Sequence, residues 1–195
     1  YVADPDTAEI PVEELLHKKT AQGLATAIDI KRAATTVPSL AIKTSDTVYL
    51  TVVDRDGNAM SFINSLYMPF GSGISTPDTG IVFQNRGACF VLDKGHLNRL
   101  AGGKRPLHTI IPGLVTASDG PHQGKVALSF GVMGGDYQPT GHAHVLSNLI
   151  DYGMDLQAAI DLPRSFLSGG RVECEHGVPD ETIFALAERG HSVST

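Results

Sequence analysis

The run Asp46-Thr47-Val48-Tyr49-Leu50-Thr51-Val52-Val53-Asp54 decides the local fold of this chain. It is rich in β-branched and aromatic residues, and this composition predicts a strand. The turn sequence Arg55-Asp56-Gly57-Asn58 follows, and a second strand-like run extends from 59 to 66. Two such runs joined by an Asp-Gly turn predict a β-hairpin.

Pairing across this hairpin determines which residue faces Thr47. With the turn centred near Asp56-Gly57, the numbers of paired positions sum to about 112 or 113. Position 47 then faces Ser65 or Leu66, and a β-bulge shifts the pairing by one residue. We therefore expect the Ser65 hydroxyl to lie beside Thr47.

The segment 35–45, just before the hairpin, is rich in Thr, Ser and Pro and has no apolar period. It reads as an extended or flexible linker, where a chain is easily cut. A Thr exposed at a new N-terminus carries its own base, because the α-amine (pKa about 8) can take the hydroxyl proton. Thr47 is thus a candidate latent nucleophile, and the alternative is that it only begins a strand.

Composition restricts the classes of protein that remain. The 195 residues, 42% apolar and 18% charged, suit one globular domain, and a net charge of −6 argues against a nucleic-acid surface. Cys89 and Cys174 have no metal-type spacing and are expected to be separate thiols. The sequence contains no apolar run of about 20 residues, so no membrane span is predicted. The chain begins at Tyr1 rather than Met, so we expect either a fragment or a processed product, and the lack of a signal peptide says nothing about its compartment.

Apolar periodicity and turn residues predict the remaining elements. Helices are expected at 11–16, 21–34, 140–152 and 155–160, with a last helix that Pro179-Asp180 opens and Gly190 ends. Val145, Leu146, Leu149 and Ile150 form the apolar stripe expected for the helix 140–152. Further strands are expected at 81–83, 107–115, 125–130 and 171–175, and one has barely begun at Ser192-Val193. This mixture predicts a layered α+β domain with a C-terminal strand missing.

Two further features are candidates for chemistry. Gly134-Gly135 lies between a predicted strand and a predicted helix, either as a simple tight turn or as a place where backbone N–H groups hold an oxyanion. Arg86 lies in a polar loop, where it either faces solvent or clamps a substrate carboxylate.

Metal sites are not indicated. His142 and His144 lie two apart on a predicted helix, about 200° around its axis, and so cannot share an ion. Asp54-x-Asp56-x-Asn58 is similar to the start of a calcium loop, but Ala59 stands where that loop needs Gly. We expect no metal and no cofactor.

Several motifs in order resemble the gamma-glutamyltranspeptidase family. They are Thr47-x-x-x-x-Val52-Val53-Asp54-x-Asp56-Gly57-Asn58, Phe70-Gly71-x-Gly73-Ile74, Lys104-Arg105-Pro106-Leu107, Gly134-Gly135, Asp151-Tyr152-Gly153-Met154, Ala158-Ala159 and Pro163-Arg164. The resemblance covers roughly residues 40–195. It implies that residues 1–46 are the end of a large subunit and that residues 47–195 are a small catalytic subunit, truncated at its C-terminus.

The resemblance also implies a fold and a chemistry. The fold is the four-layer αββα sandwich of N-terminal-nucleophile hydrolases, here partial because most of the large subunit is absent. Cleavage between Asp46 and Thr47 would make Thr47 the nucleophile that carries the acyl group. Ser65 matches a second hydroxyl residue that assists it, and Gly134 and Gly135 match the oxyanion glycines. His108 and Thr109 match a Ser-Ser pair that contacts the substrate carboxylate.

Three positions depart from typical members of the family. Tyr67 stands where they have Asn, Arg86 where they have Gln, and Cys89 where they have the Asp that binds the glutamyl α-amine. A thiol that is mostly neutral at pH 7 replaces that carboxylate poorly. Arg86 repels an ammonium group and attracts a carboxylate. The cleavage and acyl-transfer residues are kept, whereas the amino-acid clamp is not.

This pattern, with Asn85-Arg86-Gly87-Ala88 and Met133-Gly134-Gly135, is similar to the divergent branch that includes oxamate amidohydrolases. It predicts an autoprocessed heterodimer that hydrolyses a small anionic amide, with the large subunit of the same precursor as partner and with neither nucleic acid nor membrane. Two alternatives stay open: γ-glutamyl transfer or glutathione hydrolysis, and an unprocessed non-catalytic relative. The oxamate-type branch favours a cytoplasmic location, and typical members a periplasmic one.

Overall fold

The computed structural model describes residues 2–34 and 46–195, which divide into two compact units. Of the described residues, one unit contains 46–89 and 108–161 and is called here the hairpin unit. The other contains 2–34, 90–107 and 162–195 and is called the terminal unit. The linker predicted at 35–45 lies outside the described residues.

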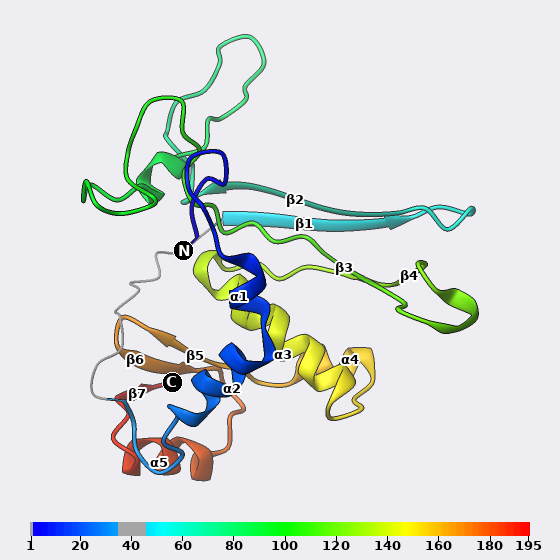
Figure 1. The fold of residues 1–195 in the computed structure, drawn as a ribbon, viewed down its shortest axis with the longest axis vertical. Coiled ribbons are helices and arrows are strands. Elements are labelled where there is room, and N and C mark those ends of the chain that lie inside the picture. Colours follow the sequence, from blue (N-terminus) through cyan, green and yellow to red (C-terminus); the bar gives the residue numbers. More distant parts are fainter. Residues whose placement is uncertain (1, 35–45) are drawn as a thin grey trace. The chain divides into compact units, whose positions relative to one another are not determined.

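The predicted hairpin is confirmed as strands β1 (Asp46–Val53) and β2 (Ala59–Tyr67), paired antiparallel (Figure 1). The Asp54 carboxylate closes its turn by accepting hydrogen bonds from the Asp56 and Asn58 amides, both at 2.9 Å. A further bond from the Asn58 side chain is the largest cause that lowers the pKa of Asp54. The Asp-x-Asp-x-Asn spacing is therefore explained by turn formation.

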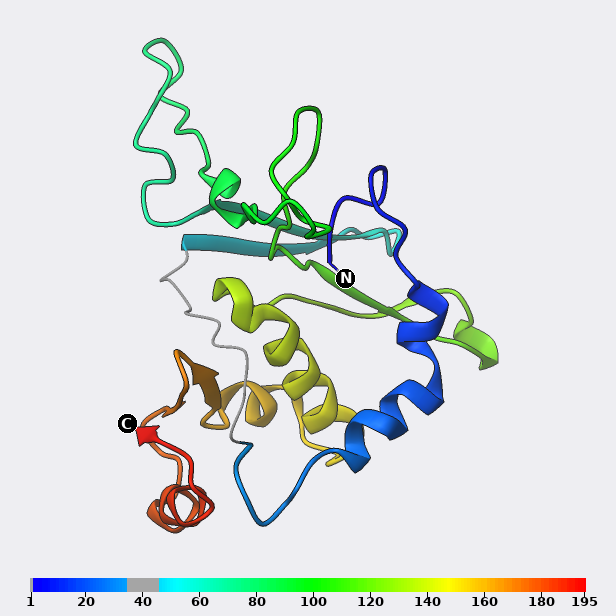
Figure 2. The same cartoon turned by 60° about the vertical axis from the view of Figure 1, so that its left-hand side comes forward.

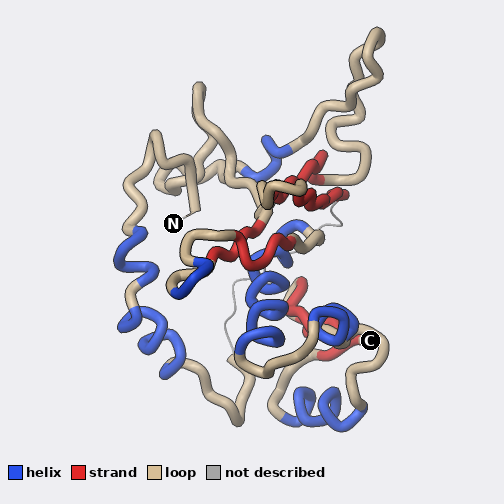
Figure 3. The backbone as a smooth tube through the Cα atoms, turned by 90° about the vertical axis from the view of Figure 1, so that its right-hand side faces the viewer, coloured by secondary structure: helices blue, strands red, loops and turns tan. Residues whose placement is uncertain are grey.

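Within the hairpin unit, two strand ribbons and a helix follow one another as layers (Figure 1 and Figure 2). Beneath β1 and β2 lie β3 (Gly113–Thr116) and β4 (Val126–Phe130), which pair antiparallel. Helix α3 (Gln138–Ile150) packs on the second ribbon. Figure 3 shows the strands of the ribbons in red and the helices in blue. The short helix α4 (Leu156–Asp161) follows it.

Specific contacts hold these layers together. Between the ribbons, the Thr51 hydroxyl donates to the Ser129 hydroxyl at 2.6 Å. A Cβ at Gly131 would stand only 2.3 Å from the Tyr49 ring, so β4 can run on past β1 because this residue is glycine. Between ribbon and helix, the rings of Phe130 and His142 lie 4.6 Å apart.

The terminal unit contains shorter elements. Its helices are α1 (Val12–Leu16), α2 (Lys18–Thr26) and α5 (Asp180–Glu188), and its sheet has the order β5 (Ser165–Ser168), β6 (Arg171–Cys174), β7 (Val193–Ser194). The Asp4 carboxylate accepts hydrogen bonds from the guanidinium and backbone of Arg105, which lower its pKa to about 2. This pair ties the N-terminal segment to the 90–107 loop.

Several predicted elements are confirmed, namely the helix at 11–16, the helix at 140–152 shifted two residues earlier, the strands near 125–130 and 171–175, and the last helix. Cys89 and Cys174 are separate thiols, as predicted. The α+β class is also confirmed, in a partial form. Within residues 2–34 and 46–195, no helix has the length and apolar character that crossing a bilayer needs.

Other predictions were wrong. Helix α2 occupies 18–26 rather than 21–34, and the strand predicted at 107–115 is the shorter β3, Gly113–Thr116. The stretch 81–83 forms a single bridge, between Val82 and Ser75. Strand β5 was missed, although Gly169-Gly170 marks its turn with φ of +55° and +82°.

The apolar stripe predicted for α3 is wrong in one respect. Ile150 is 71% exposed, whereas the fully or almost fully buried residues of this helix are Gln138, Gly141, His142 and Asn148. The helix therefore buries a polar face. Such a face needs hydrogen-bond partners in the layer above it, since an unpaired buried polar group is costly.

Candidate active site

Thr47 and Ser65 face one another at the open end of the hairpin. The predicted register is confirmed, with Thr47 opposite Ser65 and an irregularity between positions 46 and 47. The Thr47 hydroxyl donates a hydrogen bond to Ser65 Oγ at 3.0 Å. Thr47 is only 7% exposed, so this hydroxyl pair is held in a sheltered position.

A cleft of about 390 Å³ opens beside this pair. Its walls come from the hairpin and from the loop that follows it, namely Thr47, Val48, Asn64, Ser65, Leu66, Ile81 and Val82. A pair of hydroxyl groups in a mainly apolar cleft is the usual composition of a small-molecule site.

Arg86 is buried close to the end of β2, in the short 3₁₀ helix Arg86–Cys89. Its side chain is only 7% exposed, and its guanidinium lies over the Tyr67 ring, 5.5 Å from the ring centre. Nη1 donates a long hydrogen bond, 3.5 Å, to the Thr109 hydroxyl. Nη2 is buried and finds no hydrogen-bond partner among the described residues. A buried guanidinium with an unused donor suits an anionic ligand.

Arg86 and Tyr67 are partly shielded from solvent, and this burial shifts the pKa of each. Burial lowers the pKa of Arg86, because it disfavours the charged form. Burial, with a hydrogen bond to Cys89, raises the pKa of Tyr67 to about 12. Tyr67 is therefore neutral at physiological pH and does not neutralise Arg86.

The substrate-binding residues expected from the sequence are thus brought together in part. Tyr67, Arg86, Cys89 and Thr109 form one group, called here the Arg86 cluster. His108 is exposed, whereas its neighbour Thr109 is only 6% exposed.

Gly134 and Gly135 form a left-handed turn between β4 and α3, with φ of +117° and +56°. Residues other than glycine adopt this backbone conformation only at a cost in free energy, which explains why both positions are glycine. The turn leads through the 3₁₀ helix Gly135–Tyr137 directly into α3, whose N-terminal end carries partial positive charge. Gly135 is buried. The turn therefore places two glycine backbone units at the N-terminal end of a helix.

Three further residues were given no role from the sequence. Asn85 bonds to the backbone on both sides of Tyr67. The charge of Asp136, next to Gly135, contributes to raising the pKa of Tyr67, so this carboxyl lies within electrostatic reach of the cluster. Gln138 is fully buried, and its Oε1 accepts a hydrogen bond from the Ile111 amide at 2.9 Å.

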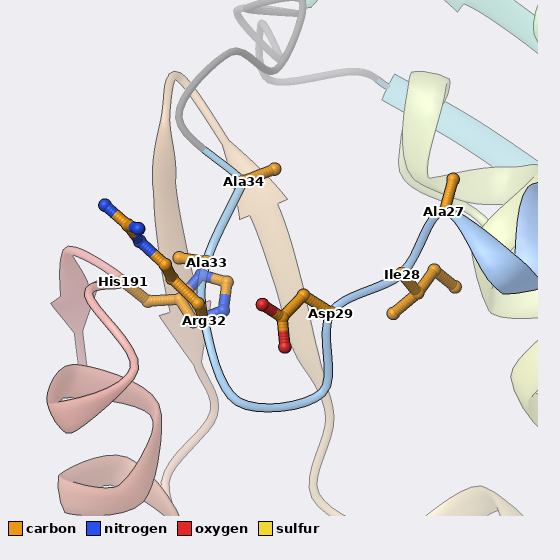
Figure 4. A pocket seen from close by; sticks show the side chains of 7 residues that line it. All are labelled: Ala27, Ile28, Asp29, Arg32, Ala33, Ala34 and His191. Carbon is orange, nitrogen blue, oxygen red and sulfur yellow. The ribbon is translucent and has the colours of Figure 1, made fainter.

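A second cavity, of about 630 Å³, lies in the terminal unit (Figure 4). It is lined by Ala27, Ile28, Asp29, Arg32, Ala33, Ala34 and His191. These lining residues include no hydroxyl or thiol nucleophile and none of the predicted site residues. Among the described residues, no group of three or more His, Cys, Asp or Glu side chains is arranged to hold a metal ion.

Comparison with known proteins gives one consistent family. The model of the gamma-glutamyltranspeptidase family matches residues 1–195. The glutathione hydrolase-like YwrD proenzyme of Bacillus subtilis is 40% identical over 98% of this chain, and the oxamate amidohydrolase proenzyme of Klebsiella pneumoniae is 39% identical over 99% of it. The crystal structure of cephalosporin acylase from Bacillus halodurans covers the whole chain with 43% identity and a TM-score of 0.86. This chain spans 34–36% of the length of these three proteins.

Proposed function

Because the chain belongs to the gamma-glutamyltranspeptidase family, we propose that it is part of an amidohydrolase precursor that cleaves itself before Thr47 and then hydrolyses a small anionic amide. The observation that carries the proposal is the hydrogen bond from Thr47 to Ser65 beside a cleft. When a hydroxyl group donates its proton to a neighbouring acceptor, its oxygen gains electron density and attacks a carbonyl carbon more readily.

The proposal divides the chain at Thr47. Residues 1–46 are the end of a large subunit, and residues 47–195 belong to the small, catalytic subunit. Two findings support this division: β1 begins within one residue of Thr47, and the relatives are named proenzymes of which this chain spans about a third. The partner is then the large subunit released from the same precursor.

In the first step, Thr47 Oγ1 attacks the carbonyl carbon of Asp46. The C–N bond between the two residues breaks, the nitrogen takes the hydroxyl proton, and an ester links Asp46 to Thr47. Water then hydrolyses this ester, which leaves a carboxyl group on Asp46 and an α-amine on Thr47. Ser65 Oγ assists by accepting the hydrogen bond from the attacking hydroxyl.

In the second step, the new α-amine takes the Thr47 hydroxyl proton while Oγ1 attacks the substrate amide. The backbone N–H groups of Gly134 and Gly135 stabilise the oxyanion. The leaving amine departs with a proton, and an acyl ester remains on Thr47. Water, activated by the same α-amine, hydrolyses this ester and releases the acid.

The Arg86 cluster determines which acyl group is accepted. The buried Arg86 Nη2 is available to a substrate carboxylate, and Thr109 holds the other guanidinium nitrogen. A carboxylate next to the scissile amide, as in oxamate, gives the buried guanidinium of Arg86 an anion to bind. Cys89 offers no carboxylate for the α-amine of a glutamyl group.

One observation favours a second candidate, γ-glutamyl transfer. The carboxyl of Asp136 is near enough to contribute to the raised pKa of Tyr67, so an anion does lie within reach of the cluster. If Asp136 binds an ammonium group, glutamyl amides become substrates despite Cys89. Asp136→Asn then abolishes their hydrolysis and leaves hydrolysis of oxamate unchanged.

The test uses the full-length precursor. Intact-mass analysis is expected to find two chains, the smaller starting at Thr47, and only an uncut chain for Thr47→Ala. The processed enzyme is expected to release ammonia from oxamate faster than it releases the anilide from a γ-glutamyl anilide. A wild-type precursor that stays uncut, as Thr47→Ala does, overturns the mechanism. A preference for the glutamyl compound overturns the assignment of Arg86.

A further inference from the structure

The end of β2 contains a strained residue. Tyr67 has a φ of +77°, in the left-handed region that bulky side chains avoid. Such a conformation persists only where its surroundings hold it, and it is common at functional sites. Tyr67 separates the two halves of the candidate site, because Ser65 precedes it in the strand and Arg86 stacks on its ring.

One residue, Asn85, holds the backbone on both sides of Tyr67. The backbone N–H of Asn85 donates to the Leu66 carbonyl at 3.1 Å. The Asn85 side-chain oxygen accepts from the Met68 amide, also at 3.1 Å. These two groups belong to the two peptide units that flank Tyr67. Fixing both units fixes the φ and ψ of the residue between them.

The strained conformation has a consequence for the nucleophile. It directs the Tyr67 amide toward Ser65 Oγ, to which it donates at 3.1 Å. The same oxygen accepts the hydrogen bond from Thr47 at 3.0 Å. Two donors on one hydroxyl oxygen restrict its rotation, so that Ser65 presents a lone pair to Thr47.

The same conformation also orders the Arg86 cluster. The Tyr67 ring lies under the guanidinium of Arg86, the residue that follows Asn85 in the chain. A cation over an aromatic face is held without use of its N–H donors. The Arg86 Nη2 group therefore stays available for a ligand.

We infer that Asn85 is a positioning residue that clamps the Tyr67 backbone in its left-handed conformation and thereby aligns the Thr47–Ser65 pair with the Arg86 cluster. It rests on the proposed function insofar as the aligned groups are catalytic. The clamp itself concerns only Asn85 and Tyr67, so it can be tested whether or not the protein is active.

The experiment is a double-mutant cycle in the full-length precursor, with Asn85→Ala, Tyr67→Gly and the pair. Glycine adopts a positive φ at almost no cost, so the clamp has little left to hold once position 67 is glycine. With Tyr67 present, Asn85→Ala is expected to lower kcat/KM for oxamate about tenfold, as loss of one buried hydrogen bond does. In the Tyr67→Gly background, the same change is expected to lower kcat/KM less than about twofold.

The separate constants distinguish positioning from a loss of folded protein. Asn85→Ala is expected to lower kcat, because Ser65 loses its alignment, and to raise KM, because Arg86 loses its support. Asn58→Ala is the matched control: it removes a side-chain hydrogen bond, to Asp54, in the turn at the other end of the hairpin. It is expected to leave both constants unchanged.

The midpoint of thermal unfolding gives a second cycle that needs no activity. Asn85→Ala is expected to lower this midpoint more when Tyr67 is present than in the Tyr67→Gly background. Equal effects in both backgrounds, in activity and in unfolding, overturn the clamp. A protein that hydrolyses no amide but shows the coupling in unfolding overturns the proposed function and leaves the clamp standing.

Discussion

The Thr47–Ser65 pair and the Arg86 cluster lie in one unit of the protein but are built differently. The pair is set by strand register: two hydroxyl residues meet because β1 and β2 pair in one way. The cluster is set by a loop, a strained residue and a buried charge. In the proposed mechanism, the pair serves any attack by Thr47, whereas the Arg86 side chain serves the choice of acyl group. Self-cleavage then needs the pair, and hydrolysis needs both the pair and Arg86.

The largest effect is expected from Thr47→Ala. Without the nucleophile, both self-cleavage and hydrolysis are lost, the latter by more than about 10³-fold in kcat/KM. Thr47→Ser keeps the hydroxyl and is expected to retain part of both activities. Chain composition by denaturing electrophoresis and ammonia release from oxamate provide the two measurements. Activity in an uncut Thr47→Ala protein would remove the pair from the mechanism.

The next largest effect is expected from Arg86→Met, and it separates the two regions. Loss of a charge-assisted hydrogen bond, about 1.5–3 kcal/mol, lowers kcat/KM for an anionic amide about 10- to 100-fold. Self-cleavage is expected to proceed at the wild-type rate, since the Arg86 side chain has no part in the proposed cleavage step. Time courses of processing and steady-state kinetics check the two halves. A block in processing as well would show that the two regions are not independent.

A change of specificity is a sharper form of the same test. Arg86→Gln together with Cys89→Asp restores the residues that typical family members have at these positions. We expect the ratio of kcat/KM for a γ-glutamyl anilide to that for oxamate to rise about tenfold or more, because a carboxylate is gained at position 89 and a guanidinium is lost at position 86. Cys89→Ser with the native Arg86 is the matched control and is expected to leave the ratio unchanged. An unchanged ratio in the double variant assigns the selection of substrate to residues outside the cluster.

The contrast between the regions also explains what the sequence could predict. The hairpin follows from local signals, a β-branched run and an Asp-Gly turn, and its register places Ser65 by arithmetic alone. The burial of Arg86 does not follow from local signals, because arginine is almost always exposed and its loop is polar. Tyr67 is a strand former, and its left-handed conformation depends on Asn85, which lies outside the hairpin.

Helix α3 shows the same limit. Its periodicity predicted a helix with an apolar stripe, and the helix is present. Its buried face, however, includes Gln138, His142 and Asn148, each of which has a hydrogen-bond partner outside its own helix. A hydrophobicity pattern cannot identify a polar face that is buried because it is paired.

A moderate effect is expected from Ser65→Ala, and it acts on both reactions. Ser65 accepts a hydrogen bond from Thr47 and does not itself attack the carbonyl in the proposed mechanism, so its loss leaves the nucleophile in place. We expect self-cleavage and kcat each to slow about tenfold, in keeping with one hydrogen bond of about 1–1.5 kcal/mol. Ser65→Thr restores the hydroxyl and is expected to rescue both. An effect on hydrolysis alone would place Ser65 with the cluster instead of the pair.

The smallest effect is expected from Tyr67→Phe, and it is read in the pH profile. The α-amine of processed Thr47, with a pKa of about 8, must be neutral to act as a base, so kcat/KM is expected to rise with pH through that value. The pKa of Tyr67 is raised to about 12, so the phenol stays protonated between about pH 6 and 10 and adds no second limb there. Removing its hydroxyl therefore leaves the shape of the profile unchanged and costs less than about threefold in kcat/KM, because the ring under Arg86 remains. A pH profile that changes shape in Tyr67→Phe would mean that the phenol exchanges a proton during the reaction. The cluster would then take part in the chemistry itself and not only in the choice of acyl group.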